Sequence, residues 1–503
     1  MTTLRPREPY SEEKLATLYP QELQLEQVQV LLRHGERTPV NARFQNAGLP
    51  KYWPYCTAAR HLRAALLQSD NQWDHMSFRR QLETFNGKDD SATLVSGPGG
   101  EKDTICLPGE LTDLGRQTTH ALGSRLRHLY VNQLKFIPAT LTASVQDQLY
   151  IRATPIPRAL ESVQQALSGL YPPSARAPDL PPPDIITRQA SDETLFPNEG
   201  SCKRFSQLAL AFGERAASIW NDSPELAYVT SKIGKWMPPD SPKVEVDSHP
   251  RLSGVMDTIN STLAHGSATK LPREFYDQKV IDAIDKIGVE EWFAGYTESN
   301  EYRRLGIGSL VGDITARLVE RAQSVHSQKV KGNEVASGKD IRFAMSGCHD
   351  TTLAAILTSL GAFEGERWPP YTSHVAIELL RDRKSLPAES TFASTGGLWE
   401  RIFGPATGIL KQPKSSRTPL QELSEGERKG LDGFFVRVRY NDAVMSVPGC
   451  RAPGKHYRDD ESLCTLSAFK DVVDKFTPRD WKKECGMRIG QSAFPEKVEE
   501  AGY

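Results

Sequence analysis

Three widely separated segments of this 503-residue chain share one pattern, a short apolar run that ends in basic or polar residues. The runs end close to Arg33, Arg152 and His349. Apolar runs of this length, separated by helix-like stretches, indicate buried strands that alternate with helices, which is typical of an α/β fold. Ligands bind at the carboxyl ends of the strands in such folds. The chain is therefore expected to assemble one site from residues far apart in the sequence.

The first segment, Leu31–Pro39, places His34 between Arg33 and Arg37, directly after the alternating run Val28–Val30. A neutral imidazole can act as a nucleophile. Guanidinium groups offer rigid forks of donors that suit a phosphoryl group. A strand end with a solvated basic turn is the simpler interpretation of a bare R-H-G, but the second arginine and the proline make the pattern more specific. The segment therefore predicts a phosphoryl-transfer site.

The second segment places His349 and Asp350 between a short core strand, Ile341–Met345, and an apolar helical stripe that closes at Gly361. Backbone N–H groups and the helix dipole favour an anion at such a turn. A simple helix-capping role is the alternative for Asp350 alone. The pairing of this segment with the first one favours a catalytic role.

The third segment ends at Arg152, after the strand-like alternation Leu149–Ile151. An arginine at a strand end is most often a surface charge. Because Arg152 has the same strand-end context as the other two motifs, it is predicted to be a third phosphate ligand.

Together these segments resemble the histidine acid phosphatases, a family marked by R-H-G-x-R-x-P and a later H-D. Glu110–Gln117 is similar to the family's L-T-x-x-G segment, and Tyr150–Ser162, which includes Arg158, is similar to its R-x-T…R…S segment. Trp368–Glu378 resembles the segment after the H-D helix. The resemblance implies a phosphoglycerate mutase-like α/β sandwich with a mainly parallel central sheet and a helical cap.

The resemblance also implies a two-step hydrolysis of phosphate monoesters without a metal or other cofactor. His34 would form a phosphohistidine, and Asp350 would donate a proton to the departing alkoxide. The phosphate-binding residues that it implies are Arg33, Arg37, Arg152 and His349. An acidic optimum would follow if Asp350 is protonated while His34 stays neutral. Glu36 occupies a variable position of the motif and is expected to face solvent, with hydrogen bonds to its neighbours as the alternative.

The length of the chain exceeds that of one ordinary core, so a core with insertions or a cap is expected. Alternating strand and helix patterns mark the core, a mostly helical stretch marks the cap, and polar stretches mark the insertions. The expected division is a core of residues 24–45, 105–195 and 336–485, an insertion of 46–104, a helical cap of 196–335 and a long surface insertion of 381–430.

The composition argues against several classes of partner. The net charge of −1 gives no general attraction to nucleic acid or to an anionic membrane. No apolar run approaches the roughly 20 residues that span a bilayer. The first residues contain no apolar core of a secretory signal, which predicts an intracellular, cytoplasmic protein, with a mitochondrial location as the alternative.

Seven widely spread cysteines are expected to be mostly reduced in such a compartment. Cys450 and Cys464 flank a polar loop and could pair in an oxidising one. No spacing of cysteine and histidine matches a metal site.

Two other functions are compatible with parts of the pattern. A phosphoglycerate mutase-like enzyme would keep the R-H-G but use a glutamate as its acid, and the H-D pair argues against it. A catalytically silent binding protein with this fold would be expected to have lost the nucleophile or the acid. A small-molecule phosphomonoester is therefore the expected partner, and the oligomeric state stays open.

The resemblance extends to the lysophosphatidic acid phosphatases within the family, which implies a lysophospholipid substrate. Such a substrate needs an apolar channel. The aromatic residues expected to form its walls are Trp292, Phe293, Tyr296, Trp53 and Tyr55. The alternative is that these aromatic side chains belong to the ordinary core.

Overall fold

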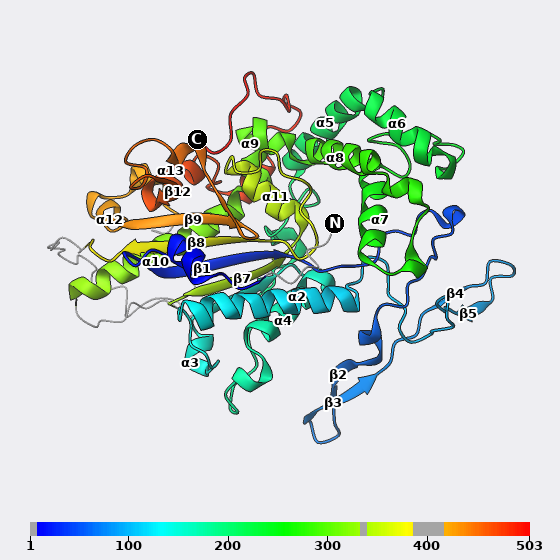
Figure 1. The fold of residues 1–503 in the computed structure, drawn as a ribbon, viewed down its shortest axis with the longest axis horizontal. Helices are drawn as coiled ribbons and strands as arrows, with labels where there is room; N and C mark the ends of the chain where they lie inside the picture. The colour runs from blue at the N-terminus through cyan, green and yellow to red at the C-terminus, as the bar shows by residue number, and fades with distance from the viewer. Residues whose placement is uncertain (1–7, 332–339, 386–416) are drawn as a thin grey trace.

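The computed structural model describes residues 8–331, 340–385 and 417–503, and its centre is a mixed eight-stranded sheet (Figure 1). The strand order is β11-β12-β9-β8-β1-β7-β6, and β10 pairs with β9. The strands are β1 Leu23–Arg33, β6 Leu149–Ala153, β7 Phe343–Cys348, β8 His374–Asp382, β9 Phe434–Tyr440, β10 Ala443–Met445, β11 His456–Tyr457 and β12 Asp460–Thr465.

The predicted α/β sandwich is confirmed, and its sheet is mixed. Parallel pairing joins β1 to β7 and β7 to β6, the three strands that carry the sequence motifs. β8, β9 and β12 extend the sheet by antiparallel pairing. The three motifs therefore meet at the carboxyl ends of the parallel strands, as the sequence predicts.

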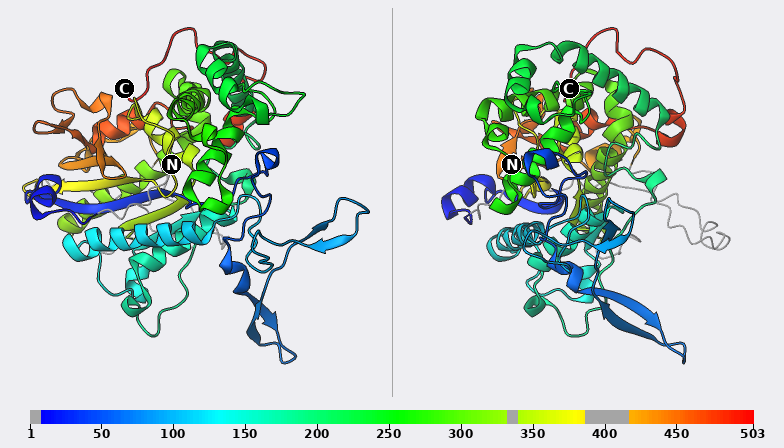
Figure 2. Two further views of the ribbon diagram at one scale, coloured as in Figure 1. Left: turned by 45° about the vertical axis from the view of Figure 1, so that its right-hand side comes forward. Right: turned by 90° about the vertical axis from the view of Figure 1, so that its right-hand side faces the viewer.

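Helices cover both faces of the sheet (Figures 1 and 2). Alternation along β1 separates the two faces, because Val28, Val30 and Leu32 pack in one core cluster and Leu31 packs in the other. The helices on the first face are α2 Asp113–Leu126 and α4 Pro157–Leu170, and those on the second are α10 Ser309–Lys331, α11 Asp350–Ser359 and α13 Leu466–Asp474.

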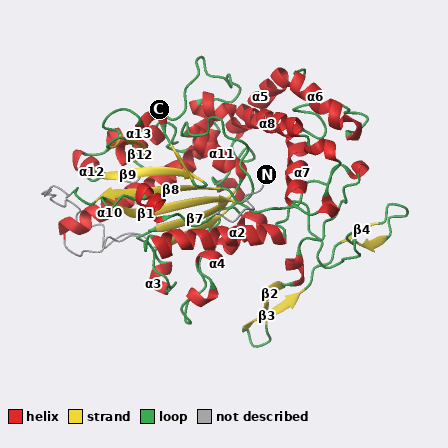
Figure 3. Cartoon of the chain, viewed as in Figure 1, coloured by secondary structure: helices red, strands yellow, loops and turns green. Residues whose placement is uncertain are grey.

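A group of helices lies at the end of the sheet where the motifs meet (Figure 3). Its members are α5 Lys203–Trp220, α6 Pro224–Ile233, α7 Leu252–Ala264, α8 Gln278–Glu298 and α9 Asn300–Arg303. The next helix, α10, packs on the sheet instead: the Gln27 and Gln29 amides of β1 donate to backbone carbonyls of α10. The helical stretch 196–335 thus supplies both this cap and one layer of the sandwich.

The insertion of residues 46–104 contains two separate β-hairpins that extend away from the body (Figures 1 and 2). The strands are β2 Leu62–Leu67 with β3 Trp73–Phe78, and β4 Glu83–Phe85 with β5 Ala92–Leu94. The segment was expected to be polar, but several large apolar side chains on these strands are exposed.

The expected insertion of residues 381–430 connects two neighbouring strands, because β8 and β9 pair as far as Arg381 and Phe434. Residues 386–416 of it lie outside the described residues. The remainder contains the short helix α12 Glu425–Lys429. Three further short helices are α1 Glu12–Leu18, α3 Ala143–Gln146 and α14 Trp481–Cys485.

The expectation of mostly reduced cysteines is wrong, because six of the seven form disulfides. The pairs are Cys56–Cys106, Cys202–Cys485 and Cys450–Cys464. The first closes the hairpin insertion at its base, and the second joins the start of α5 to α14. The remaining thiol, Cys348, is buried, and burial raises its pKa.

A buried ion cluster joins β8 to β9. Glu378 is fully buried, and its carboxylate accepts hydrogen bonds from Tyr19 at 2.6 Å and Tyr130 at 2.7 Å. It also accepts two from Arg437, at 2.9 and 2.7 Å, and lies 3.3 Å from Arg439. Burial alone would raise the pKa of Glu378, but the two arginine charges and the tyrosine hydroxyls lower it to about 2.

Glu378→Gln is expected to destabilise the protein by about 3–5 kcal/mol at pH 7, because it leaves two buried arginines without their anion. The lowered pKa means that this stabilisation is complete above about pH 4.5 and is lost as the pH falls toward 2. Urea unfolding at pH 7 and pH 3 should show a difference from the parent that shrinks at the lower pH. The control is Glu422→Gln, which removes an exposed partner of Arg479. A pH-independent difference would contradict the charge argument.

Candidate active site

His34 follows β1 directly and is buried. Its Nδ1 lies 2.9 Å from the carbonyl oxygen of Gly35, which orients the ring and places the proton on Nδ1. The lone pair on Nε2 is then available for attack on an electrophile. Burial lowers the pKa of His34 well below its usual value, and the charges of Arg158, Arg33 and Arg37 add to this effect. His34 therefore stays neutral and nucleophilic in acid.

The loop after His34 depends on two glycines that allow close backbone contact. A Cβ on Gly35 would lie 2.3 Å from the carbonyl oxygen of Gly115, and one on Gly115 would lie 2.2 Å from that of Glu36. Gly115 belongs to the first turn of α2, within the L-T-x-x-G segment. This explains why a glycine is needed in both motifs.

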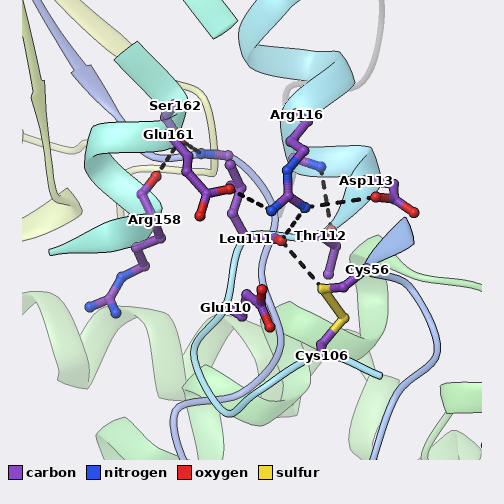
Figure 4. Close-up of polar contacts among 12 residues, drawn as sticks. Cys56, Cys106, Glu110, Leu111, Thr112, Asp113, Arg116, Arg158, Glu161 and Ser162 are labelled. Carbon is purple, nitrogen blue, oxygen red and sulfur yellow. Dashed lines mark hydrogen bonds and ion pairs between the residues drawn. A yellow bond between two sulfur atoms is a disulfide. The ribbon is translucent and has the colours of Figure 1, made fainter. Parts of the chain in front are cut away.

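The L-T-x-x-G segment also holds the loop through backbone contacts (Figure 4). Thr38 donates its N–H to the carbonyl of Glu110 at 3.1 Å, and Thr112 donates to that of Glu36 at 3.0 Å. Figure 4 shows Arg116 bound to the Leu111 carbonyl, beside the Cys56–Cys106 disulfide. The disulfide thus lies next to the contacts that hold the loop after His34.

Glu36 was expected to face solvent, and this prediction is wrong. Its side chain is fully buried and accepts a hydrogen bond from the Thr118 hydroxyl of α2. The close approach of α2 to the loop at Gly115 covers this position. Glu36 therefore links the loop to the helix.

Two arginines of the first motif line the site. Arg33 lies 2.7 Å from the Asp350 carboxylate, donates to the Pro369 carbonyl at 2.6 Å, and stacks 4.1 Å from the centre of the Tyr371 ring. Arg37 lies 2.6 Å from Asp257 of α7. Both guanidinium groups are therefore held rigidly, as a phosphate clamp requires.

Arg152 does not join Arg33 and Arg37 at the site, and its predicted role as a phosphate ligand is wrong. Its side chain is buried and ion-paired to Glu193 at 2.5 Å. Burial lowers its pKa, and Glu193 opposes that effect. The backbone of Arg152 lies at the carboxyl end of β6, as predicted. Its side chain, however, points to Glu193, and the Glu193 carboxylate neutralises the guanidinium charge.

Arg158, in the first turn of α4, takes the position expected for Arg152. After burial, it is the strongest influence that lowers the pKa of both His34 and His349. Burial and the charge of Arg37 lower its own pKa to about 10. Its Nε is buried with no hydrogen-bond partner among the described residues. Figure 4 shows its guanidinium extending from α4 with no contact drawn to it.

The second motif lies at the start of α11. His349 is buried, and its ring centre lies 5.5 Å from that of His34. Its Nε2 lies 3.1 Å from the Thr154 hydroxyl, in the third motif. Burial and the charge of Arg158 lower the pKa of His349 to about 3, so it is neutral and can donate one hydrogen bond to an oxyanion.

Asp350 lies beside the clamp. Its carboxylate accepts a hydrogen bond from the Trp368 indole at 3.0 Å, in addition to its ion pair with Arg33. Burial alone would raise the pKa of Asp350, but the charge of Arg33, the Trp368 hydrogen bond and the charge of Arg37 lower it to about 2. Asp350 is therefore ionised in the unliganded protein.

Asp257 is a site residue that the sequence motifs do not reveal. It lies on α7 of the cap, and besides Arg37 it contacts Arg43 at 3.4 Å and accepts the Val40 N–H at 3.0 Å. Its position about 220 residues after the motif gives no local sequence signal. The cap is thus joined to the clamp by a carboxylate.

A cavity of about 590 Å³ opens above the clamp. Its floor includes Arg33, Arg37 and Asp350, and its walls come from the cap and the loop after the first motif. The wall residues are Val40, Asn41, Ala42, Arg43, His249, Pro250, Arg251, Ser253, Gly254, Met256, Asp257, Asn260, Trp292, Thr351, Trp368 and Tyr371. About half of these side chains are polar or charged, and most of the surface that lines the cavity is apolar.

The expected apolar channel is not formed by the aromatic residues chosen for it. Phe293, Tyr296 and Trp53 are buried in the core, and Tyr55 packs against it. Trp292 alone among the five lines the cavity. These side chains are mostly ordinary core, which was the alternative interpretation.

In residues 8–331, 340–385 and 417–503, no three histidine, cysteine, aspartate or glutamate side chains cluster as metal ligands would. Over the same ranges, the helices are all too short or too polar to span a bilayer.

Known proteins resemble this chain along most of its length. The family described as the histidine phosphatase superfamily, branch 2, matches residues 24–392. A probable acid phosphatase of Schizosaccharomyces pombe is 38% identical over 473 residues, which cover 93% of this chain and 95% of the relative. The lysophosphatidic acid phosphatase type 6 of Homo sapiens is 24% identical over 383 residues, which cover 72% and 75% of the two chains.

Solved structures share the fold. A phytase of Hafnia alvei aligns with a TM-score of 0.51 and 14% identity, covering 93% of this chain and 99% of the phytase. A multiple inositol polyphosphate phosphatase of Bifidobacterium longum aligns with a TM-score of 0.52 and 11% identity, covering 94% and 97%. With a family match along most of its length and a relative 38% identical over nearly all of it, the chain belongs to branch 2 of the histidine phosphatase superfamily.

Proposed function

We propose that this phosphatase transfers the phosphoryl group of a monoester to Nε2 of His34 and then to water. The observation that carries this proposal is the oriented, neutral His34 surrounded by Arg33, Arg37 and Arg158. In the first step the Nε2 lone pair forms the P–N bond as the ester P–O bond breaks. The Gly35 carbonyl, which accepts a hydrogen bond from Nδ1–H, stabilises the positive charge that the ring acquires.

Asp350 would act as the general acid that protonates the leaving group. The ester P–O bond breaks with its electron pair, so the departing alkoxide takes a proton from Asp350 and leaves as an alcohol. In the second step the Asp350 carboxylate removes a proton from the attacking water, the P–N bond breaks, and inorganic phosphate leaves. The three arginines and His349 would hold the non-bridging oxygens in both steps.

The low pKa of Asp350 implies that its proton arrives with the substrate. Asp350 is ionised above about pH 2, whereas a phosphate monoester binds as the monoanion below its second pKa of about 6. Once the phosphate lies among the arginines, its negative charge raises the pKa of Asp350 and favours transfer of the substrate proton to it.

The pH dependence of kcat/KM tests this proposal. Since the pKa of His34 is held well below its usual value, kcat/KM should be nearly level around pH 5 and should fall tenfold per unit above about pH 6, as the monoanion disappears. Asp350→Asn should cost roughly 100-fold more for glycerol 3-phosphate than for p-nitrophenyl phosphate, because nitrophenolate leaves without a proton. Equal losses for both substrates would leave Asp350 as a structural cap of α11.

The cavity walls favour a substrate with a second anionic or strongly polar group. Arg43, His249 and Arg251 line the cavity outside the clamp. Burial lowers the pKa of Arg43, and Asp257 opposes this effect. Arg251 in turn pairs with Glu291 at 2.6 Å. Both guanidinium groups remain hydrogen-bond donors for a second anionic group on the substrate. A lysophospholipid is the second candidate, because Met256, Trp292 and Trp368 contribute to an apolar surface there.

A substrate series separates these candidates. We expect a sugar bisphosphate to give a kcat/KM about tenfold higher than the matching monophosphate, and Arg43→Ala to remove most of that preference while sparing p-nitrophenyl phosphate. Lysophosphatidic acids of increasing acyl length should show little gain. A gain near 0.8 kcal/mol per methylene would instead establish an apolar channel and the lipid substrate.

The compartment proposed for the protein is an oxidising one. The sequence interpretation favoured the cytoplasm, with mitochondria as the alternative. Three disulfides are rare in the reducing cytoplasm, which supports the secretory pathway or the cell exterior instead. Fractionation of the producing cells, with thiol labelling before and after reduction, tests this location.

A further inference from the structure

Thr372 has a strained backbone next to the nucleophile. Its φ is 62°, and among the non-glycine residues of positive φ in the described ranges it is the only β-branched one. A branched side chain in this left-handed region is an outlier that persists only where surrounding contacts hold it, and such outliers cluster at functional sites. Thr372 is also buried, so the interior of the protein sets its conformation.

The backbone around Thr372 contacts both residues at the end of β1. The Thr372 N–H donates to the His34 carbonyl at 3.2 Å, and the Arg33 N–H donates to the Ser373 carbonyl at 2.9 Å. The ring of the preceding residue, Tyr371, has its centre 5.9 Å from that of the His34 ring. The position of His34 therefore depends on that of Thr372.

The Thr372 side chain begins a series of hydrogen bonds that leads to a buried carboxylate. Its Oγ1 lies 2.9 Å from that of Thr118, and the Thr118 hydroxyl donates to Glu36. A carboxylate accepts hydrogen bonds, and Thr118 has one hydroxyl proton, so Thr372 is the donor to Thr118. We call Thr372, Thr118 and Glu36 the hydroxyl chain.

Packing alone does not fix the Thr372 side chain. A cavity of about 360 Å³ borders both Thr118 and Thr372. Side chains beside a cavity lack packing contacts on that side. The directional hydrogen bonds of the hydroxyl chain therefore supply the restraint that the strained backbone needs.

We propose that Thr372, held by Thr118 and Glu36, is a positioning residue that fixes His34 for attack on phosphorus. The inference rests on the proposed role of His34 as the nucleophile. A reacting group misplaced by about 1 Å can lose on the order of 100-fold in rate. Release of Thr372 should therefore slow the formation of the P–N bond while the clamp still binds phosphate.

Thr118→Val tests this role, because it removes the central hydroxyl of the hydroxyl chain with little change of shape. Rapid quenching should show that phosphoenzyme forms roughly 10- to 100-fold more slowly from p-nitrophenyl phosphate. The inhibition constant of inorganic phosphate should stay within about threefold of the parent, because the clamp arginines are unchanged. Thr118→Ser keeps the hydroxyl and should restore the rate to within about threefold of the parent.

The matched control is Thr119→Val. Thr118 and Thr119 are neighbours on α2, and their hydroxyls lie 3.2 and 2.7 Å from the Gly115 carbonyl oxygen. The additional contacts with Glu36 and Thr372 belong to Thr118. Thr119→Val should therefore leave the rate of phosphoenzyme formation unchanged. Equal rates for the two valine variants would overturn the proposal. Tenfold weaker inhibition by phosphate in Thr118→Val would also overturn it, because the hydroxyl chain would then hold the clamp and not the nucleophile.

Thr372→Gly provides a second measurement. Glycine adopts this φ without strain and keeps the backbone N–H, so the variant should melt within a few degrees of the parent. Because it loses the hydroxyl, phosphoenzyme formation should slow about as much as in Thr118→Val, and a parental rate would overturn the proposal. A parent that forms no phosphoenzyme would overturn the proposed function and this role with it, whereas the other adverse outcomes would overturn this role alone.

Discussion

Replacing His34 with alanine is expected to reduce kcat by at least ~10⁴-fold, because it removes the atom proposed to form the covalent intermediate. His34 is buried, but alanine fits its backbone, so the fold should persist. Rapid quenching of the parent with labelled substrate in an alkaline denaturant should trap a phosphoenzyme whose label is released by acid. The variant should show none.

The control for this experiment is His120→Ala, which removes an exposed histidine of α2. Its turnover should match that of the parent within about twofold. A His34→Ala protein with more than a per cent of parental activity would falsify the assignment of the nucleophile. Phosphoenzyme that survives in the variant would point to another acceptor.

Much of the site could be predicted from local patterns. The run before His34 alternates between the two faces of the sheet, and the strand before His349 begins with the apolar run Phe343–Met345, so both histidines are placed at the ends of adjacent parallel strands. The physical reason is that parallel neighbours align their carboxyl ends. Sequence motifs at strand ends therefore meet without any long-range information.

The errors at Arg152 and Glu36 have a different origin. A position at the end of a strand predicts where the backbone of a residue lies. It predicts neither the face to which the side chain points nor the residue that the side chain contacts. Arg152 meets Glu193, which lies 41 residues later, and Glu36 meets Thr118, which lies 82 residues later. Such pairings arise from tertiary packing, and no periodicity in the sequence encodes them.

The cap contact of Asp257 and the disulfides belong to the same class. Asp257 reaches Arg37 from a helix 220 residues away. The Cys202–Cys485 bond spans 283 residues. A cysteine count can suggest pairing but cannot assign it.

Arg158→Ala is expected to reduce kcat/KM by roughly 10²–10³-fold, the usual loss for one preorganised donor to a developing anion. It should also weaken inhibition by inorganic phosphate. Arg158 is the strongest charge that lowers the pKa of His34, so its removal lets that pKa rise. Protonation of His34 then begins at higher pH, and activity on the acid side of the profile should fall earlier than in the parent.

The matched comparison is Arg152, which the sequence motifs predicted as the third phosphate ligand. Arg152→Ala would leave Glu193 as a buried, uncompensated anion and cost about 3–5 kcal/mol of stability, so loss of activity could reflect unfolding. The double variant Arg152→Met with Glu193→Gln removes both charges and avoids that problem. It should keep kcat/KM within about tenfold of the parent and leave the acid side of the pH profile unchanged. If the double variant instead loses activity as Arg158→Ala does, Arg152 contributes to the phosphate clamp and the pairing with Glu193 is not its main role.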